Sequence, residues 1–201
     1  GVLLVFVQRP FHIEDQSNVK TRLATLFVLL IALVSPAGAL EVKLADGGKS
    51  QLPVVISESA SDRVKTSAKT LADYLRRISG AEFSIQTTDA ELGIFVGATL
   101  DFPKSGLVNH FRPTELTRRE EYLLKTDKRG LWLLGATDLA VEHAVWDLLH
   151  RLGYRQFFPG KAWEVVPSRS DLSIDVDVFG QLGDVGDDRH LVVRHLDEAA
   201  V

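Results

Sequence analysis

The chain has 201 residues, of which 45% are hydrophobic and 25% are charged, and its formal net charge is −4. This composition is that of a globular protein, and the acidic balance gives no reason to expect a nucleic acid as a partner. An α/β barrel needs about 250 residues, so the chain without an export segment is too short for one. The absence of cysteine excludes disulfides and cysteine-based metal sites.

Residues 1–39 are predicted to be an upstream extension followed by a signal peptide. Lys20 and Arg22 precede an apolar run of twelve residues, 23–34, and the small residues 37–39 follow it. A membrane span needs about twenty apolar residues, so the pattern favours a cleaved signal over a retained anchor. We therefore expect cleavage after Ala39, a secreted or periplasmic product and no stable membrane span after cleavage.

Residues 1–18 do not fit the usual opening of a signal peptide, because a short apolar piece and a polar segment stand before the basic residues. The chain also contains no methionine. From these two observations we expect that translation begins near Val19 at an alternative start codon. Residues 1–18 would then be an artefact of the assigned gene start.

The first half of the predicted domain, residues 40–179, is expected to have the order strand, strand, helix, strand, strand. The predicted strands are residues 41–45, 53–57, 83–87 and 92–97. The strand at 83–87 is predicted from its alternation of apolar and polar residues, and the strand at 92–97 from its apolar run. Between the second and third strands, Ser59 or Ser61 caps a helix that Gly80 ends. One apolar face of this helix is predicted from Val64, Ala68, Leu71, Ala72, Leu75 and Ile78.

The second half begins with a predicted surface loop, residues 101–119, that contains prolines and scattered apolar residues. A hairpin of residues 122–126 and 131–134 follows. Thr137 then caps a helix of residues 138–152, whose apolar positions recur at three- and four-residue spacing. After the helix, short strands are predicted at residues 154–158, 163–166 and 172–179.

Together, two helices and about eight strands predict an α+β or α/β sandwich, in which two main helices pack on one face of a mixed β-sheet. Residues 180–201 lose the pattern of the preceding domain. We interpret them as a poorly ordered tail, or as the remnant of a truncation or frameshift.

The sequence predicts no catalytic, cofactor-binding or metal-binding residue. Glu142, His143 and His150 lie on a predicted helix, but they lack the spacing of a zinc protease, so a surface pair of histidines is favoured over a metal site. Glu120 and Glu121 are adjacent on a predicted strand edge, where they would point to opposite faces and be solvated. They are therefore not expected to form the carboxylate pair of a glycosidase.

Four aromatic residues near the end of the predicted domain are candidates for carbohydrate contact: Tyr154, Phe157, Phe158 and Trp163. Exposed rings at these positions would suit the faces of pyranose sugars. Rings that close the core of a small sheet would give the same sequence pattern, and this second interpretation is favoured.

Several stretches together resemble a known domain: LADYLRRISGAEF (71–83), IFVGA (94–98), residues 120–160 with GAT, a helix ending in LG and FFPG, and WEVVP (163–167). They resemble the N-terminal non-catalytic α/β domain that precedes the catalytic barrel in bacterial α-glucuronidases. That domain is similar to the second domain of β-hexosaminidases and also occurs in uncharacterised secreted proteins that look like glycoside hydrolases. The resemblance covers about residues 41–179. The chain departs from it where many relatives have an Arg-Gly pair and this sequence has Leu139-Ala140.

The resemblance implies a β-hexosaminidase domain-2-like fold and a non-catalytic accessory domain of a secreted carbohydrate-active protein. It also implies that the chain is a fragment without the catalytic barrel, so no catalytic residue can be carried over to it. The expected partner is the barrel of the parent protein or a polysaccharide. Two alternatives stay open: a free-standing carbohydrate-binding module, and a domain that hydrolyses glycosides unaided.

Overall fold

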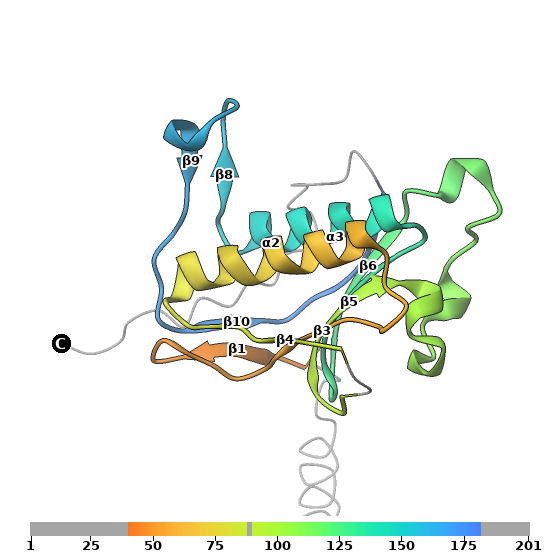
Figure 1. Ribbon diagram of the computed structural model, residues 1–201, viewed down its shortest axis with the longest axis horizontal. Coiled ribbons are helices and arrows are strands. Elements are labelled where there is room, and N and C mark those ends of the chain that lie inside the picture. The colour runs from red at the N-terminus through yellow and green to blue at the C-terminus, as the bar shows by residue number, and fades with distance from the viewer. Residues whose placement is uncertain (1–39, 88–89, 182–201) are drawn as a thin grey trace, which may run out of the picture. The chain divides into compact units, whose positions relative to one another are not determined.

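The computed structural model describes residues 40–87 and 90–181, which form an α+β fold with a mixed sheet (Figure 1). The predicted signal peptide, start site and cleavage point lie outside the described residues, as does the tail beyond residue 181. Within the described ranges, no helix is long and apolar enough to cross a bilayer.

The main sheet has six strands, and its order mixes two kinds of pairing. In spatial order the strands are β11 (Asp177–Gly180), β6 (Tyr122–Asp127), β7 (Gly130–Gly135), β5 (Gly93–Ala98), β3 (Val54–Val55) and β4 (Ile85–Gln86). The first three are antiparallel neighbours, whereas β7, β5, β3 and β4 run parallel. Hairpins and helical crossovers therefore occur together, which confirms the predicted mixed sheet.

Two smaller sheets flank the main one. The first has the order β10 (Leu172–Ile174), β1 (Val42–Asp46) and β2 (Lys49–Ser50). The second is a hairpin of β8 (Arg155–Gln156) and β9 (Glu164–Val165). Figure 1 shows that this hairpin projects past the helices on the side away from the main sheet.

Both predicted helices are present, and their caps are the predicted ones. Helix α2 (Asp62–Ser79) begins at Ser61, whose side chain accepts a hydrogen bond from the Val64 amide, and it ends at Gly80 in the left-handed conformation. Helix α3 (Asp138–Arg151) begins at Thr137, whose hydroxyl accepts from the Ala140 amide. The apolar faces of the two helices are buried in one cluster with residues of β1, β3, β5, β6 and β7.

The opposite face of the main sheet is covered by residues 99–119. The sequence predicted a surface loop here, but Leu107 and Phe111 are buried against Phe95 and Trp132 of the sheet. The segment folds as four 3-10 turns, η1 (Thr99–Asp101), η2 (Pro103–Ser105), η3 (Val108–His110) and η4 (Leu116–Arg118). Short turns carry no helical or strand period, and for this reason the pattern did not reveal a second core.

Several predicted strands are shorter in the structure, since residues 53–57 keep only β3 and residues 154–158 keep only β8. Two other predicted strands differ in a more informative way. Residues 172–179 divide between β10 and β11, because the Val176 amide donates to the Thr126 hydroxyl at 3.1 Å and the Thr126 amide donates to the Val176 carbonyl at 2.7 Å. These bonds redirect the chain from one sheet to the other. Residues 83–87 contain only the two-residue β4, where Ile85 is 37% exposed, while Phe83 is buried as predicted.

A buried ion pair connects α3 to β6. The carboxylate of Asp147 is fully buried; it accepts from the Arg151 guanidinium at 3.0 Å and from the Tyr122 hydroxyl at 3.1 Å. Arg151 is itself only 7% exposed. Removal of one member of such a pair leaves an uncompensated charge inside the protein. The resulting loss of folding stability is larger than the net stabilisation that the intact pair provides.

We therefore expect Asp147→Ala to lower the free energy of unfolding by about 3–5 kcal/mol, because the Arg151 charge stays buried without its partner. Urea unfolding followed by circular dichroism measures this change. Lys43→Ala is the matched control, since it removes an exposed pair with Asp46 and should change the value by less than about 0.5 kcal/mol. Similar losses in the two variants would contradict the role of the buried pair.

Candidate functional site

Exposed aromatic rings gather on the hairpin of β8 and β9, which we call the aromatic arm (residues 155–165). Phe157, Phe158 and Trp163 are 66%, 60% and 53% exposed. The rings of Phe158 and Trp163 lie 5.0 Å apart between centroids, at an angle of 70°. The arm therefore presents a cluster of aromatic surface to the solvent.

The favoured sequence interpretation, in which the rings close the core, is wrong for three of the four candidates. It is right for Tyr154, which is 4% exposed and packs at the base of the arm. The three others are exposed on a hairpin that projects past the helices (Figure 1). A sequence pattern of apolar residues does not report whether a neighbouring element will lie over them.

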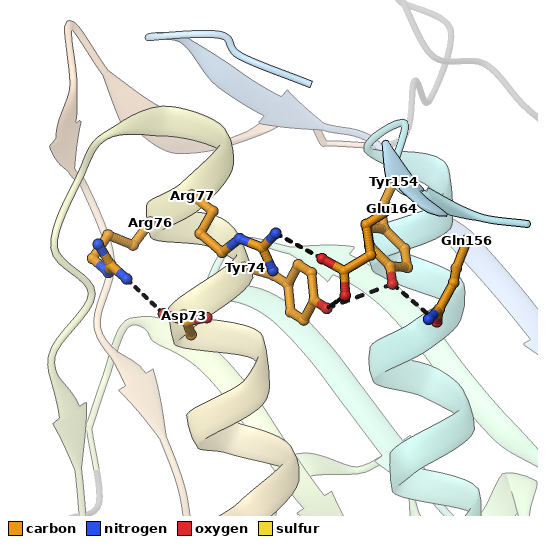
Figure 2. A network of polar contacts seen from close by, with 7 residues as sticks. All are labelled: Asp73, Tyr74, Arg76, Arg77, Tyr154, Gln156 and Glu164. Carbon is orange, nitrogen blue, oxygen red and sulfur yellow. Dashed lines mark hydrogen bonds and ion pairs between the residues drawn. The ribbon is translucent and has the colours of Figure 1, made fainter. Parts of the chain in front are cut away.

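The arm is joined to α2 by a polar cluster that we call the clamp, made of Glu164, Arg77 and Tyr74 (Figure 2). The Arg77 guanidinium donates to one carboxylate oxygen of Glu164 at 2.7 Å, and the Tyr74 hydroxyl donates to the other at 2.9 Å. Arg77 also lies over the Tyr74 ring, 4.5 Å from its centroid. The Glu164 side chain is only 10% exposed, so it points toward the helices and away from the rings.

The base of the arm is packed by aromatic side chains. Tyr74 meets Tyr154 edge-on at 4.8 Å and Trp146 at 5.6 Å between ring centroids. The Tyr154 hydroxyl lies 3.5 Å from that of Tyr74 and donates to Gln156 at 3.2 Å. Because each phenol has one proton, the Tyr74 proton serves Glu164 and the Tyr154 proton serves Gln156.

The charges of the clamp are fixed by its contacts. Hydrogen bonds from Arg77 and then Tyr74 hold the pKa of Glu164 below its ordinary value, because both stabilise the carboxylate. Burial is the main cause that raises the pKa of Tyr154. Near neutral pH Glu164 is therefore an anion and Tyr154 a neutral phenol.

The other candidates from the sequence do not form a site. Glu121 is 7% exposed and pairs with Arg118 at 2.5 Å, which corrects the expectation that both glutamates are solvated. The reason is that Glu121 lies just before β6 and outside the strand, where strand alternation does not apply. His143 and His150 are half-buried on α3, and within the described ranges no group of three or more histidine and acidic side chains could hold a metal ion.

Comparison with known proteins gives distant structural similarity. No protein-family model matches the chain, and no curated protein shows significant sequence similarity to it. Among solved structures, it is similar to a family GH115 4-O-methyl-α-glucuronidase with specificity for decorated arabinogalactans, with 17% identity and a TM-score of 0.44 over 66% of this chain. It is also similar to a GH138 enzyme targeting pectin rhamnogalacturonan II, with 15% identity and a TM-score of 0.37 over 50% of this chain. The match spans 18% and 13% of these two proteins.

The clamp leads to a prediction about the arm. We expect Glu164→Gln to lower the hydrogen-exchange protection of residues 155–165 several-fold without a change in melting temperature, because the ion pair with Arg77 is lost while the core is untouched. In the unsubstituted protein, the protection should be complete above the ordinary pKa of glutamate. It should fall only as the pH drops through the lowered pKa of Glu164, because protonation then removes the carboxylate.

Asp73→Asn is the matched control, because it breaks the neighbouring surface pair between Asp73 and Arg76 (2.7 Å, Figure 2) and leaves the clamp intact. Protection factors, which correct for the intrinsic pH dependence of exchange, are the quantity to compare. Equal protection of the arm in the Glu164→Gln variant and the unsubstituted protein would show that the clamp does not hold the arm.

Proposed function

We propose that this chain is a non-catalytic accessory domain of a secreted carbohydrate-active protein, a fragment without its catalytic barrel, and that its aromatic arm contacts polysaccharide. The observation that carries the proposal is the exposure of Phe157, Phe158 and Trp163 on one hairpin. The resemblance of residues 71–167 to the domain that precedes the barrel in α-glucuronidases supports the same assignment.

The rings suit a sugar because both partners are amphipathic. One face of a pyranose presents C–H groups, and an aromatic ring offers a flat apolar surface of matching size. Removing the exposed area of a large aromatic side chain from water is worth about 1.5–3 kcal/mol. Contact with two or three rings is therefore enough for the modest affinity of a module that keeps a polymer near a catalytic domain.

The arm is also held in place before a ligand arrives. The clamp fixes β9 to α2, and the Phe157 amide donates to the Trp163 carbonyl at 3.2 Å, which closes the turn that bears the rings. Binding then does not have to order the hairpin, so less of the contact energy is spent on conformational entropy. This arrangement supports a binding role for the arm.

We expect Trp163→Ala to weaken binding to a soluble polysaccharide about tenfold or more, because the loss of ring contact is worth at least about 1.4 kcal/mol. Affinity gel electrophoresis with a panel of neutral and acidic polysaccharides measures the retardation. Phe179→Ala is the matched control, since Phe179 is 44% exposed but lies on β11. Retardation of none of the polysaccharides, or equal retardation of both variants, would refute the proposal.

A free-standing carbohydrate-binding module is the second candidate, and the same exposed rings favour it. The two candidates differ in what surrounds the domain. The accessory domain has a catalytic barrel as its neighbour in the parent protein, whereas the free-standing module binds polysaccharide without a neighbouring catalytic domain. The nucleotide sequence downstream of Phe179 separates them, because an intact stop codon without barrel coding in any frame removes the fragment assignment.

The proposed location is outside the cytoplasm, either secreted or periplasmic. The basic residues, the apolar run of residues 23–34 and the small residues 37–39 support it. Expression of the full chain in a bacterial host should give an exported product whose first residue is Leu40. N-terminal sequencing of the exported fraction measures this, and a product that keeps residues 23–34 would instead indicate a retained anchor.

A further inference from the structure

The turn that bears the exposed rings also carries a cation. Lys161 is exposed and is the first residue of the 3-10 turn η5 (Lys161–Trp163), which ends at Trp163. The Trp163 amide donates to the Gly160 carbonyl at 3.0 Å, and the Phe157 amide donates to the Trp163 carbonyl at 3.2 Å. Residues 157–163 therefore form one closed turn, in which Lys161 is the one charged residue and stands between the aromatic positions in sequence.

The protein does not neutralise the charge of Lys161. Glu164 is the one acidic residue among residues 151–170, and its two carboxylate oxygens accept from Arg77 and Tyr74. The pKa of Glu164 is lowered mainly by Arg77 and least by Lys161, so Arg77 is its counter-ion. Within the described ranges, the Lys161 ammonium forms no hydrogen bond and no ion pair.

Basic side chains gather around the arm, although the chain as a whole is acidic. Residues 151–170 contain four basic residues and one acidic residue, whereas the formal net charge of the chain is −4. Arg155 of β8 donates to two backbone carbonyl oxygens, which carry no net charge. The Arg169 guanidinium lies at the base of the arm, 3.9 Å from where a Cβ atom of Gly153 would stand. The arm is thus a positive region, and its field attracts anions.

A polysaccharide with anionic groups matches both the rings and the charge. The C–H face of a pyranose can cover the rings of Phe158 and Trp163, while a carboxylate or sulfate of the polymer pairs with the Lys161 ammonium. A neutral polysaccharide covers the rings but displaces water from Lys161 without replacing it. An anionic lipid surface fits less well, because such surfaces are recognised by clusters of about 4–8 basic residues or by amphipathic helices, and the turn has neither.

We propose that the aromatic arm binds an anionic polysaccharide, with Phe158 and Trp163 against a sugar ring and Lys161 paired with a carboxylate or sulfate of the polymer. This inference rests on the proposed function, because it takes the arm as the polysaccharide contact. It adds the chemical class of the ligand and assigns Lys161 as the residue that determines specificity.

Isothermal titration calorimetry of the full chain with polymers that share a backbone tests the proposal. One pair is polygalacturonate and its fully methyl-esterified form. The other is carboxymethyl cellulose and hydroxyethyl cellulose, to which cellulose sulfate adds a sulfated member that separates the two anionic groups. We expect the anionic member of at least one pair to bind about three- to fivefold more tightly than the neutral one, since one exposed ion pair is a weak contact. Added NaCl should remove this preference, because salt screens exposed charges.

Lys161→Gln should lower the affinity for the anionic polymer to that for its neutral partner and leave the neutral polymer unaffected. Trp163→Ala should weaken the binding of both about tenfold, because both cover the rings. Lys128→Gln is the matched control, since it removes the same charge from an exposed residue in the turn between β6 and β7 of the main sheet. It should keep the preference for the anionic polymer.

Three results would overturn the proposal. Equal affinity for the two members of every pair would show that the arm contacts only the apolar faces of sugars, and the proposed function would still stand. An equal loss of affinity in Lys161→Gln and Lys128→Gln would indicate non-specific attraction to a polyanion. Binding to none of the polymers would refute the proposed function as well, and binding to phosphatidylglycerol vesicles in their place would assign the arm to a lipid surface.

Discussion

The start of α3 depends on a close approach that only glycine permits. A Cβ atom at Gly135, the last residue of β7, would lie 2.4 Å from the Val141 amide nitrogen and 2.7 Å from the Ala140 carbonyl carbon. These are backbone atoms of α3, so a side chain at this position would force the helix away from the sheet. Because β7 leads almost directly into α3, this contact fixes where the helix begins.

The buried pair of Asp147 and Arg151 fixes the second half of the same helix. It joins α3 to Tyr122 of β6 through a carboxylate that the solvent does not reach. A helix held near its start by Gly135 and farther along by Asp147 has little freedom to tilt or slide. The aromatic arm, which leaves the end of α3 after Gly153, therefore starts from a defined position.

The helices could be predicted from the sequence because their signals are local. Ser61 and Thr137 each cap the amide three residues further on, and the apolar residues of each helix repeat on one face. The hairpin of β6 and β7 was predicted for the same reason. In contrast, the division of residues 172–179 depends on Thr126, which lies 50 residues before Val176 in the chain. The alternation of apolar and polar residues within the strand does not reveal such a distant contact.

The candidate site could be predicted only in part, for a related reason. The residue types of the arm were recognised as candidates for carbohydrate contact, but the favoured interpretation placed their rings in the core. Whether Trp163 is covered depends on elements that lie far away in sequence, and a hairpin beyond the helical layer leaves it open. The clamp was not foreseen either, since Arg77 and Glu164 are 87 residues apart.

The clamp shows how a weak interaction can matter for geometry. Arg77 is about one-third exposed, and ion pairs near the surface contribute little to global stability because water and salt screen them. Within the described part of the chain, however, the two short strands of the arm pair only with each other. For such a hairpin, the charged contact and the hydrogen bonds from Tyr74 and Tyr154 help to hold its direction, even though surface contacts of this kind add little to the free energy of unfolding. The orientation of the rings is thus separable from the stability of the domain that carries them.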